Sequence, residues 1–403
     1  MNVVLLVDKY YPVPQANENC ALAILEAMDD CHVDVICKVT SEEAYQSVMR
    51  QNGGIPPVLV PVSPSLMDSG VFRKLKYVWT KIWKIFFGRL YSHQETRAYI
   101  SSFEQIYSKK KVDVVVAVQS PLETVEAVCQ LKRKYPELKT IIYDVDTASN
   151  CSMGILERRF ANFYLNKVYR WEKRVFASAD LIIHLAQHRN HFSQKQYSRF
   201  LNKTLFQEVP LLKCDIVPES RNENQPISFL YSGSFYRKFR SPHLITNLMD
   251  SICEKEVCNV SYYVNREFYP MLSEKYANIQ NVCVSGYVPE QKLKEIIRNT
   301  DFLLSLGNKD SEMFPSKTVQ YVAARKPIIH VYQSEKDPVI PFLENYPDKL
   351  LIDASSDFNE NCRKILTFIQ EERPAIAVED IQKWYEVYSG KYNAAQIFSF
   401  LKN

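Results

Sequence analysis

The stretch from Asp301 to Tyr332, DFLLSLGNKDSEMFPSKTVQYVAARKPIIHVY, decides the fold of this chain. Phe302–Leu306 is a short, mostly apolar run, which is typical of a strand buried on both faces of a parallel sheet. Gly307 ends that run and a polar loop follows. Pro315 stands where a helix begins, because its missing N–H costs nothing in a first helical turn. Residues 328–331 form the next apolar run, so the order is strand, loop, helix, strand.

The start of this helix has a chemical consequence. Ser316 and Lys317 lie where unpaired backbone N–H groups and the helix dipole attract an anion. Glu312 stands eight positions before Gln320, so a carboxylate and an amide flank the same junction. The alternative is ordinary scaffold, since a strand followed by a helix with proline at its start is common in α/β proteins.

These residues resemble the retaining glycosyltransferases of GT-B fold, in the large family whose signature is Glu, seven residues, Glu. The match is closest to the bacterial capsular and exopolysaccharide branch, which carries a Pro-Ser-Lys helix start. The resemblance implies two doubly wound, Rossmann-like α/β domains that face each other across a cleft. It also implies that Glu312 lies near the transferred sugar and that Pro315, Ser316 and Lys317 hold the diphosphate. Gln320 stands where the resembled family has a second Glu that holds the ribose. Its amide oxygen can accept a hydrogen bond from a ribose hydroxyl but carries no charge.

Length and composition agree with two globular domains. The chain has 403 residues, of which 46% are hydrophobic and 24% charged, too many residues for one ordinary core. The formal net charge of +4 predicts no nucleic-acid partner. The sequence has no Gly-x-Gly-x-x-Gly or Walker loop, which argues against a dinucleotide-dependent dehydrogenase and a P-loop enzyme.

Cysteine usage and the absence of long apolar runs predict a cytoplasmic chain. The ten cysteines form no Cys-x-x-Cys pair, and Cys253 and Cys258 are the closest two. We interpret all of them as reduced thiols rather than disulfides or zinc ligands. Residues 3–7 are too short for a signal core, and no run approaches the roughly 20 apolar residues that span a bilayer.

The N-terminal half opens with a strand at residues 2–7, a polar loop at residues 10–19 and a helix at residues 20–28. In the resembled family this loop carries glycines that face the sugar, whereas here it reads Pro-Gln-Ala-Asn at residues 14–17. Asn17 is therefore a candidate to hydrogen-bond an acceptor. An ordinary surface turn is the alternative.

Two further strand ends carry polar residues. Residues 113–118 predict a central strand that ends in Gln119 and Ser120, where the resembled family often has a His. These two residues are acceptor-side candidates. Asp144 and Asp146 follow another strand, and an Asp-x-Asp pair can hold a metal and a diphosphate. We favour a loop start with solvated carboxylates, and we predict no metal site.

The sequence predicts a basic amphipathic helix from Val71 to Tyr91. It contains no acidic residue, and its apolar side collects Phe72, Leu75, Trp79, Ile82, Trp83, Phe86 and Leu90. Lys and Arg lie across or beside that side. This pattern predicts a helix that lies in a membrane interface. Packing of the same stripe against its own domain is the alternative.

The C-terminal half begins after a polar linker between residues 208 and 224. A strand from residue 227 leads to Gly233, which lets a phosphate approach the backbone closely. The cations Arg237, Lys238 and Arg240 follow. The resembled family has an Arg beside this Gly, and Ser234 takes its place here. An exposed basic turn is the alternative. The resemblance also places the nucleotide base beside Gly286, Tyr287 and Val288.

The sequence therefore predicts residues 1–208 as an acceptor-side domain and residues 209–375 as a nucleotide-sugar domain. Residues 376–403, with an aromatic helical tail from 381 to 401, would cross back to the first domain. We predict transfer of a sugar, with retention, from a UDP-sugar to a lipid-linked or polysaccharide acceptor at the inner face of the cytoplasmic membrane. Lys317 and Arg237 would stabilise the leaving diphosphate without a cofactor. An epimerase of the same fold and a non-catalytic partner subunit are the rivals.

Overall fold

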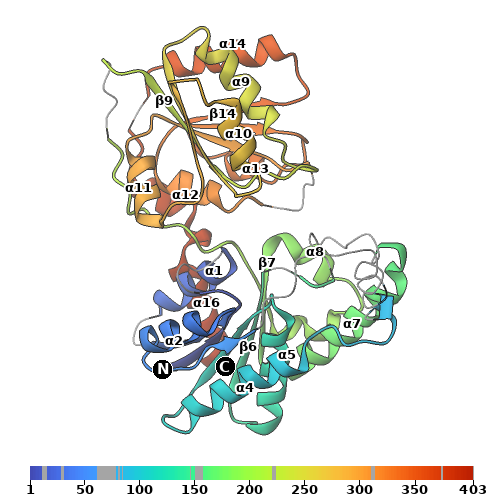
Figure 1. The fold of residues 1–403 in the computed structure, drawn as a ribbon. Helices are drawn as coiled ribbons and strands as arrows, with labels where there is room; N and C mark the ends of the chain where they lie inside the picture. The colour runs from blue at the N-terminus through green and yellow to red at the C-terminus, as the bar shows by residue number, and fades with distance from the viewer. Residues whose placement is uncertain are drawn as a thin grey trace. The chain divides into compact units, whose positions relative to one another are not determined.

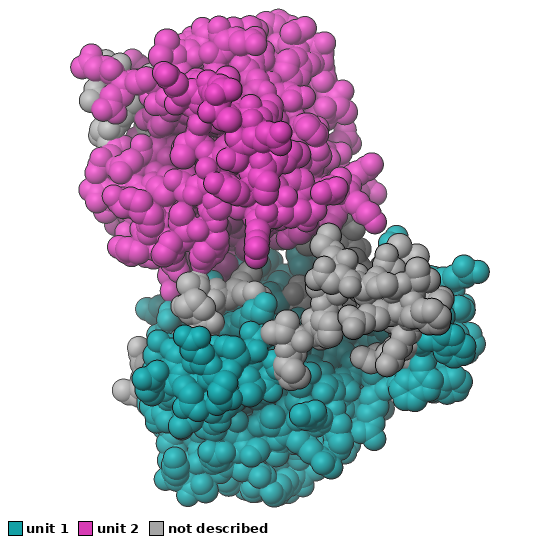
Figure 2. All heavy atoms as spheres, viewed as in Figure 1, with its two compact units in different colours: residues 1–210, 390–403 teal, residues 211–389 magenta. Residues whose placement is uncertain are grey.

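A computed structural model describes residues 1–10, 16–28, 31–60, 79, 82–83, 85–145, 147–149, 158–219, 224–309, 314–373 and 375–402. The chain forms two compact units, residues 1–210 with 390–403 (unit 1) and residues 211–389 (unit 2), shown in Figures 1 and 2. Each unit is a parallel sheet covered by helices. The predicted fold class of two Rossmann-like α/β domains is confirmed.

The sheet of unit 1 has the strand order β2-β1-β5-β6-β7-β8, and all its pairs are parallel. Its strands are β1 (Asn2–Leu6), β2 (His32–Ile36), β5 (Val114–Val118), β6 (Lys139–Asp144), β7 (Leu181–Leu185) and β8 (Thr204–Gln207). They are rich in Val, Ile and Leu because both faces of the sheet are covered. The short strands β3 (Lys38–Val39) and β4 (Val58–Leu59) pair separately. The chain reverses its direction of travel across the sheet between β1 and β5, the point at which ligands of open α/β sheets bind.

Helices cover both faces of this sheet (Figure 1). They are α1 (Ala16–Glu26), α2 (Glu42–Gln51), α4 (His93–Tyr107), α5 (Leu122–Lys134), α7 (Ala161–Ser178), α8 (Arg189–Phe192) and α16 (Gly390–Lys402), with 3₁₀ turns at Ala186–His188 and Ser198–Lys203. Ser41 and Ser92 cap α2 and α4 by accepting from backbone N–H groups three residues on. The core joins Val115 and Ala117 of β5 to Tyr99, Phe103 and Trp171 of α4 and α7.

The end of the chain differs from the continuous helical tail that the sequence predicts. The helix α15 (Val378–Trp384) is followed by a 3₁₀ turn (Glu386–Tyr388), and α16 then begins at Gly390 and packs against α1. A Cβ at Gly390 would lie 2.0 Å from the backbone oxygen of Ala23. The break therefore falls at the residue whose lack of a side chain permits this close approach.

The sheet of unit 2 has the order β11-β10-β9-β12-β13-β14, also parallel throughout. Its strands are β9 (Ile227–Gly233), β10 (Cys258–Val264), β11 (Val282–Ser285), β12 (Phe302–Leu306), β13 (Ile328–Tyr332) and β14 (Lys349–Asp353). Its remaining helices are α9 (His243–Cys253), α10 (Tyr269–Lys275), α11 (Glu290–Arg298), α12 (Lys317–Ala323), α13 (Val339–Phe342) and α14 (Phe358–Gln370). The order of the strands reverses between β9 and β12.

Two local predictions are wrong. Cys253 and Cys258 form a disulfide, because the turn between the end of α9 and the start of β10 brings their Cα atoms to 5.6 Å. Asn17 lies in the first turn of α1 rather than in a loop, since that helix begins at Ala16. In the part of the chain that the structure describes, no helix is both long and apolar enough to cross a bilayer.

Candidate functional site

The carboxyl edge of unit 2 brings several predicted residues together at the reversal of its sheet. Gly233 ends β9, and Ser234 opens the turn that leads to Arg240. Gly307 and Asn308 follow the end of β12, the neighbouring strand. Ligands of open α/β sheets bind outside the carboxyl ends of strands at such a point.

Arg240 is the buried cation of this edge. Tyr236 and Arg240 exchange two backbone hydrogen bonds of 3.0 Å, which close the turn and direct the arginine inward. Its Nε donates to Asn308 Oδ1 at 2.9 Å and its Nη1 to the backbone oxygen of Ser234 at 3.3 Å. The residue is 9% exposed, and no carboxylate among the described residues lies within ion-pair distance of it. Its partners are neutral, so the site retains a positive charge.

A buried polar network fixes the loop that carries Asn308. A Cβ at Gly307 would lie 1.7 Å from Asp337 Oδ2, so the backbone there is packed directly against this acid. Asp337 accepts from the backbone N–H of Val339 at 2.9 Å and lies 3.3 Å from His330 Nε2. The other ring nitrogen of His330 lies 2.9 Å from Ser305 Oγ.

Gln333 ties the loops after β9 and β12 to each other. Its Nε2 donates to the backbone oxygens of Phe239 at 2.9 Å and Gly307 at 2.8 Å. The backbone N–H of Lys309 also donates to Phe239, at 2.9 Å. Hydrogen bonds therefore link the two loops that position Arg240 and fix them relative to each other.

The helix α12 begins at Lys317, with Ser316 at its N-cap position. Lys317 Nζ donates to Gln320 Oε1 at 2.9 Å, so the residues expected at the diphosphate and the ribose contact each other. Burial lowers the pKa of Lys317, and the more distant Glu290 opposes this shift. An anionic ligand stabilises the charged form of an ammonium group that is partly removed from water.

The hydroxyl of Tyr321 joins α12 to the end of β9. It accepts from the backbone N–H of Ser232 at 2.9 Å and lies 3.2 Å from the oxygen of the same residue. Burial raises the pKa of this phenol, which stays neutral. Sequence reasoning missed Tyr321 and Asn308, because one lies in an apolar run and the other reads as a turn residue.

Other predicted residues lie at the surface of unit 2. Arg237 is 79% exposed at its side chain and its Nε lies 3.0 Å from Glu267 Oε1. Lys238 is exposed in the same turn. Tyr287 is 74% exposed between β11 and α11, and its neighbours Gly286 and Val288 are partly exposed. Glu312 lies outside the described residues, as does Asp146 of the Asp-x-Asp pair.

The corresponding edge of unit 1 carries a buried amide. Gln119 follows β5 and is fully buried, and neither its Oε1 nor its Nε2 has a hydrogen-bond partner among the described residues. Ser120 comes next, with a φ of 94°. Glu18 in α1 is 1% exposed and accepts from the backbone N–H of Lys9 at 3.4 Å. Burial raises the pKa of Glu18.

Acidic residues dominate this edge. Lys38 Nζ lies 2.6 Å from Glu95, 3.8 Å from Asp8 and 3.9 Å from Glu123, so three carboxylates surround one cation. Asp144 is fully buried, and its Oδ2 lies 2.7 Å from His184 Nδ1. It is thus neither the solvated loop carboxylate that we favoured nor exposed to a diphosphate.

Glu172 is a further buried acid beside the end of β6. It accepts from the backbone N–H of Ser149 at 3.0 Å and from the hydroxyl of Tyr197. Burial raises the pKa of Glu172 to about 8, and the nearby Asp144 adds to the shift. This carboxyl is therefore protonated at neutral pH.

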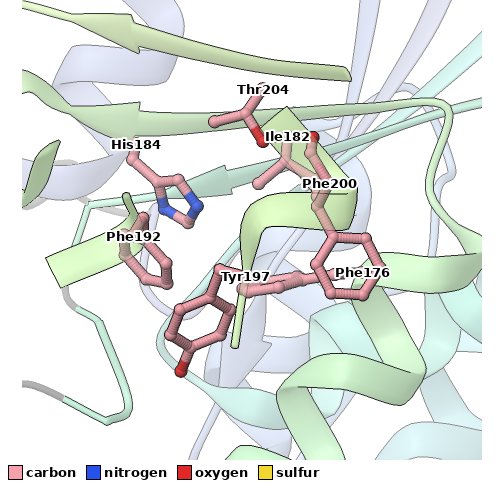
Figure 3. A pocket seen from close by; sticks show the side chains of 7 residues that line it. All are labelled: Phe176, Ile182, His184, Phe192, Tyr197, Phe200 and Thr204. Atoms are coloured by element: carbon pink, nitrogen blue, oxygen red, sulfur yellow. Dashed lines mark hydrogen bonds between the residues drawn. The ribbon is translucent and has the colours of Figure 1, made fainter. Parts of the chain in front are cut away.

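Aromatic side chains close the space beside His184. Figure 3 shows the ring of Phe192 stacked on His184, and their centroids are 3.4 Å apart. The hollow that these residues share is too small to hold a water molecule. Its lining comprises Phe176, Ile182, His184, Phe192, Tyr197, Phe200 and Thr204. This part of unit 1 is packed core, and burial lowers the pKa of His184 accordingly.

The two sheets, with the strand orders given above, define the GT-B fold. Among solved structures, the chain is similar to the sucrose-phosphate synthase of Thermosynechococcus elongatus, with 12% identity, a TM-score of 0.61 and coverage of 100% and 98% of the two chains. It is similar to the UDP-GlcNAc 2-epimerase of Methanocaldococcus jannaschii, with 12% identity, a TM-score of 0.54 and coverage of 99% and 100%. The S. aureus protein MnaA, solved with UDP, gives 11% identity, a TM-score of 0.53 and coverage of 100% and 96%. No family model and no curated protein matches the sequence. At these identities the likeness shows the fold alone.

Proposed function

We propose that this chain is a glycosyltransferase that takes a sugar from a nucleotide diphosphate donor, a UDP-sugar, whose diphosphate binds at the carboxyl edge of unit 2. One observation carries the proposal: Arg240 is buried at the reversal of the sheet with neutral partners. The similar proteins include a sucrose-phosphate synthase and a protein solved with UDP, which supports this class of ligand.

The donor would lie across the residues that unit 2 already gathers. Gly233 and Ser234 admit a phosphate close to the backbone, and Arg240 supplies paired N–H donors to its oxygens. Lys317 would leave Gln320 for the diphosphate, which frees the amide of Gln320 for the ribose. The exposed ring of Tyr287, with Gly286 and Val288, would cover the base.

The chemistry we propose is transfer with retention. The bond between the anomeric carbon and the diphosphate oxygen breaks, and the acceptor oxygen bonds to the same face of the sugar. The hydroxyl proton of the acceptor passes to the leaving phosphate oxygen. Arg240 and Lys317 stabilise the charge that grows on this oxygen, with Arg237 as a further cation and Glu312 near the sugar. The retention and the role of Glu312 rest on the family resemblance.

The acceptor would bind unit 1. Gln119, whose buried amide lacks a partner among the described residues, suits a hydroxyl of a saccharide once side chains around it move. Asn17 and Ser120 lie on neighbouring segments of the same unit. We propose a lipid-linked precursor of a cell-surface polysaccharide, met at the inner face of the cytoplasmic membrane.

A screen of UDP-sugars tests the reaction, each incubated with and without a lipid-linked saccharide acceptor. A transferase releases UDP much faster when the acceptor is present and leaves the donor sugar unchanged. The likeness to UDP-GlcNAc 2-epimerase favours one rival, which converts the donor to its epimer without an acceptor. That result would contradict the transferase, and no binding of any UDP-sugar would favour a non-catalytic partner subunit.

A further inference from the structure

Among its described residues, unit 1 exposes four large aromatic side chains in two segments. Trp79 is 70% exposed, Trp83 55%, Phe87 78% and Phe163 63%. Rings of this size normally bury most of their surface in a core or an interface. Contiguous exposed apolar surface marks a place where a protein meets another phase or partner.

These rings belong to one surface. The ring centroid of Phe86 lies 5.0 Å from that of Phe160 and 5.1 Å from that of Phe163, and 6.2 Å from that of Phe87. Figure 1 shows the light-blue segment near residue 85 beside the green helix α7. We call Trp79, Trp83, Phe86, Phe87, Phe160 and Phe163 the aromatic patch.

The exposed members of the first segment lie on one helical face. Trp79, Trp83 and Phe87 are spaced by four residues, and the backbone N–H of Phe87 donates to the oxygen of Trp83 at 2.8 Å. Ile85 points the other way and is 4% exposed. Packing on the chain's own domain therefore uses Ile85 and Phe86, and it leaves the tryptophan face outward.

The patch has a basic surround. Arg89 is exposed two residues after Phe87, and Arg158 and Arg159 are exposed immediately before Phe160. Residues 71–91 contain no acidic side chain, and the acid-free stretch of residues 158–171 is bounded by Glu157 and Glu172. Aromatic rings flanked by several arginines are complementary to a surface that is apolar inside and anionic at its rim.

We infer that the aromatic patch is a docking surface for an anionic lipid bilayer, formed jointly by the described residues 79, 82–83 and 85–89 and by residues 158–163 at the start of α7. The tryptophan and phenylalanine rings enter the headgroup level, and the arginines contact lipid phosphates. This inference goes beyond the proposed transfer reaction, since it depends only on the surface chemistry of unit 1.

Vesicle binding by the full chain, without nucleotide, tests the inference. We expect the wild type to sediment with vesicles of phosphatidylglycerol and phosphatidylcholine, and to bind pure phosphatidylcholine at least tenfold more weakly. The triple variant Trp83→Ser, Phe87→Ser, Phe163→Ser should lose at least tenfold in affinity for the anionic vesicles. Val257→Ser, which removes an apolar residue of unit 2 that is 77% exposed, is the matched control and should bind as the wild type does.

Two further measurements separate the contributions of the arginines and of the aromatic rings to vesicle binding. The pair Arg158→Gln, Arg159→Gln should weaken binding to anionic vesicles and reduce its dependence on salt. Brominated lipid should quench Trp79 and Trp83 in the wild type and leave the buried Trp171, which is 5% exposed, unaffected. The inference is overturned by a wild type that ignores anionic vesicles, by a triple variant that binds them equally, or by a patch that instead pairs two copies of the chain in solution. UDP binding is measured separately, so either proposal can fail without the other.

Discussion

The two units share a parallel-sheet architecture, and their carboxyl edges carry different buried ionisable groups. In unit 2 the buried guanidinium of Arg240 has an amide and a backbone oxygen as hydrogen-bond partners, and the buried acid Asp337 lies beside Gly307. In unit 1 the buried ionisable groups include the carboxyl groups of Glu18 and Glu172, and the cation Lys38 faces three carboxylates. The shared sheet topology therefore does not determine which ligand binds. The residues at the strand ends determine it.

The difference has an energetic basis. Removing a cation from water without an acidic partner is costly, and an anionic ligand offsets that cost when it binds. A buried carboxyl group is more readily protonated: burial raises the pKa of Glu18, and it raises the pKa of Glu172 to about 8. We therefore expect an anion at unit 2 and a neutral, hydroxyl-bearing molecule at unit 1.

The largest effect should come from Gly307→Ala. The added Cβ would fall 1.7 Å from Asp337 Oδ2, so the loop or the acid has to shift, which we expect to cost about 3 kcal/mol or more. Thermal unfolding should show a transition of unit 2 at a lower temperature. Gly286→Ala is the control, since nothing lies within 4 Å of its added Cβ, and equal stability of the two variants would contradict the packing described.

Asn308→Asp places a carboxylate beside the cation of unit 2, as carboxylates already lie beside Lys38 in unit 1. The new carboxylate would pair with Arg240 Nε, which hydrogen-bonds Asn308 Oδ1 at 2.9 Å in the wild type. We expect unchanged or higher thermal stability, together with a loss of about 2 kcal/mol in UDP affinity, because the cation is neutralised. Calorimetry and thermal unfolding on the same preparation measure both effects. UDP affinity at or above that of the wild type would show that the charge of Arg240 is not used.

Glu172→Gln tests the neutral acid of unit 1. A folded-state pKa of about 8 lies above the unfolded value, so the folded state holds the proton that the unfolded state releases above about pH 4.5. The contribution of Glu172 to stability is therefore lost as pH rises toward 8, by at most about 1.4 kcal/mol per pH unit. The variant should lack this slope and be more stable than the wild type at pH 8. Parallel curves for the two proteins from pH 5 to 8 would contradict a protonated Glu172.

Lys317→Met should have the smallest effect on the free protein. Burial lowers the pKa of this ammonium group, so its replacement by an uncharged side chain should raise the free energy of unfolding at pH 7. The same variant should gain less from UDP in a thermal-shift experiment than the wild type does. Stability of the wild type should rise relative to the variant as pH climbs through the lowered pKa of Lys317, and a flat difference would argue against burial of its charge.

Sequence patterns could predict the strands and the class of fold, because runs such as Phe302–Leu306 are apolar and bounded by turn residues. The contact between Lys317 and Gln320 follows from their spacing by three on a helix. The partnership of Arg240 with Asn308 joins residues 68 positions apart, and no local pattern reports it. Burial of Glu18 and Glu172 depends on neighbours from other segments for the same reason. The Cys253–Cys258 disulfide was missed because their spacing matches no metal or redox motif.

The most direct test of an anion site in unit 2 is calorimetric titration of UDP into the wild type, Arg240→Met and Arg363→Met. Arg363→Met is the control. It removes the same positive charge from an exposed position on α14, away from the carboxyl edge. We predict binding by the wild type and by Arg363→Met, and at least a hundredfold weaker binding by Arg240→Met with its fold retained. Equal affinity of all three proteins, or no UDP binding by the wild type, would contradict the account.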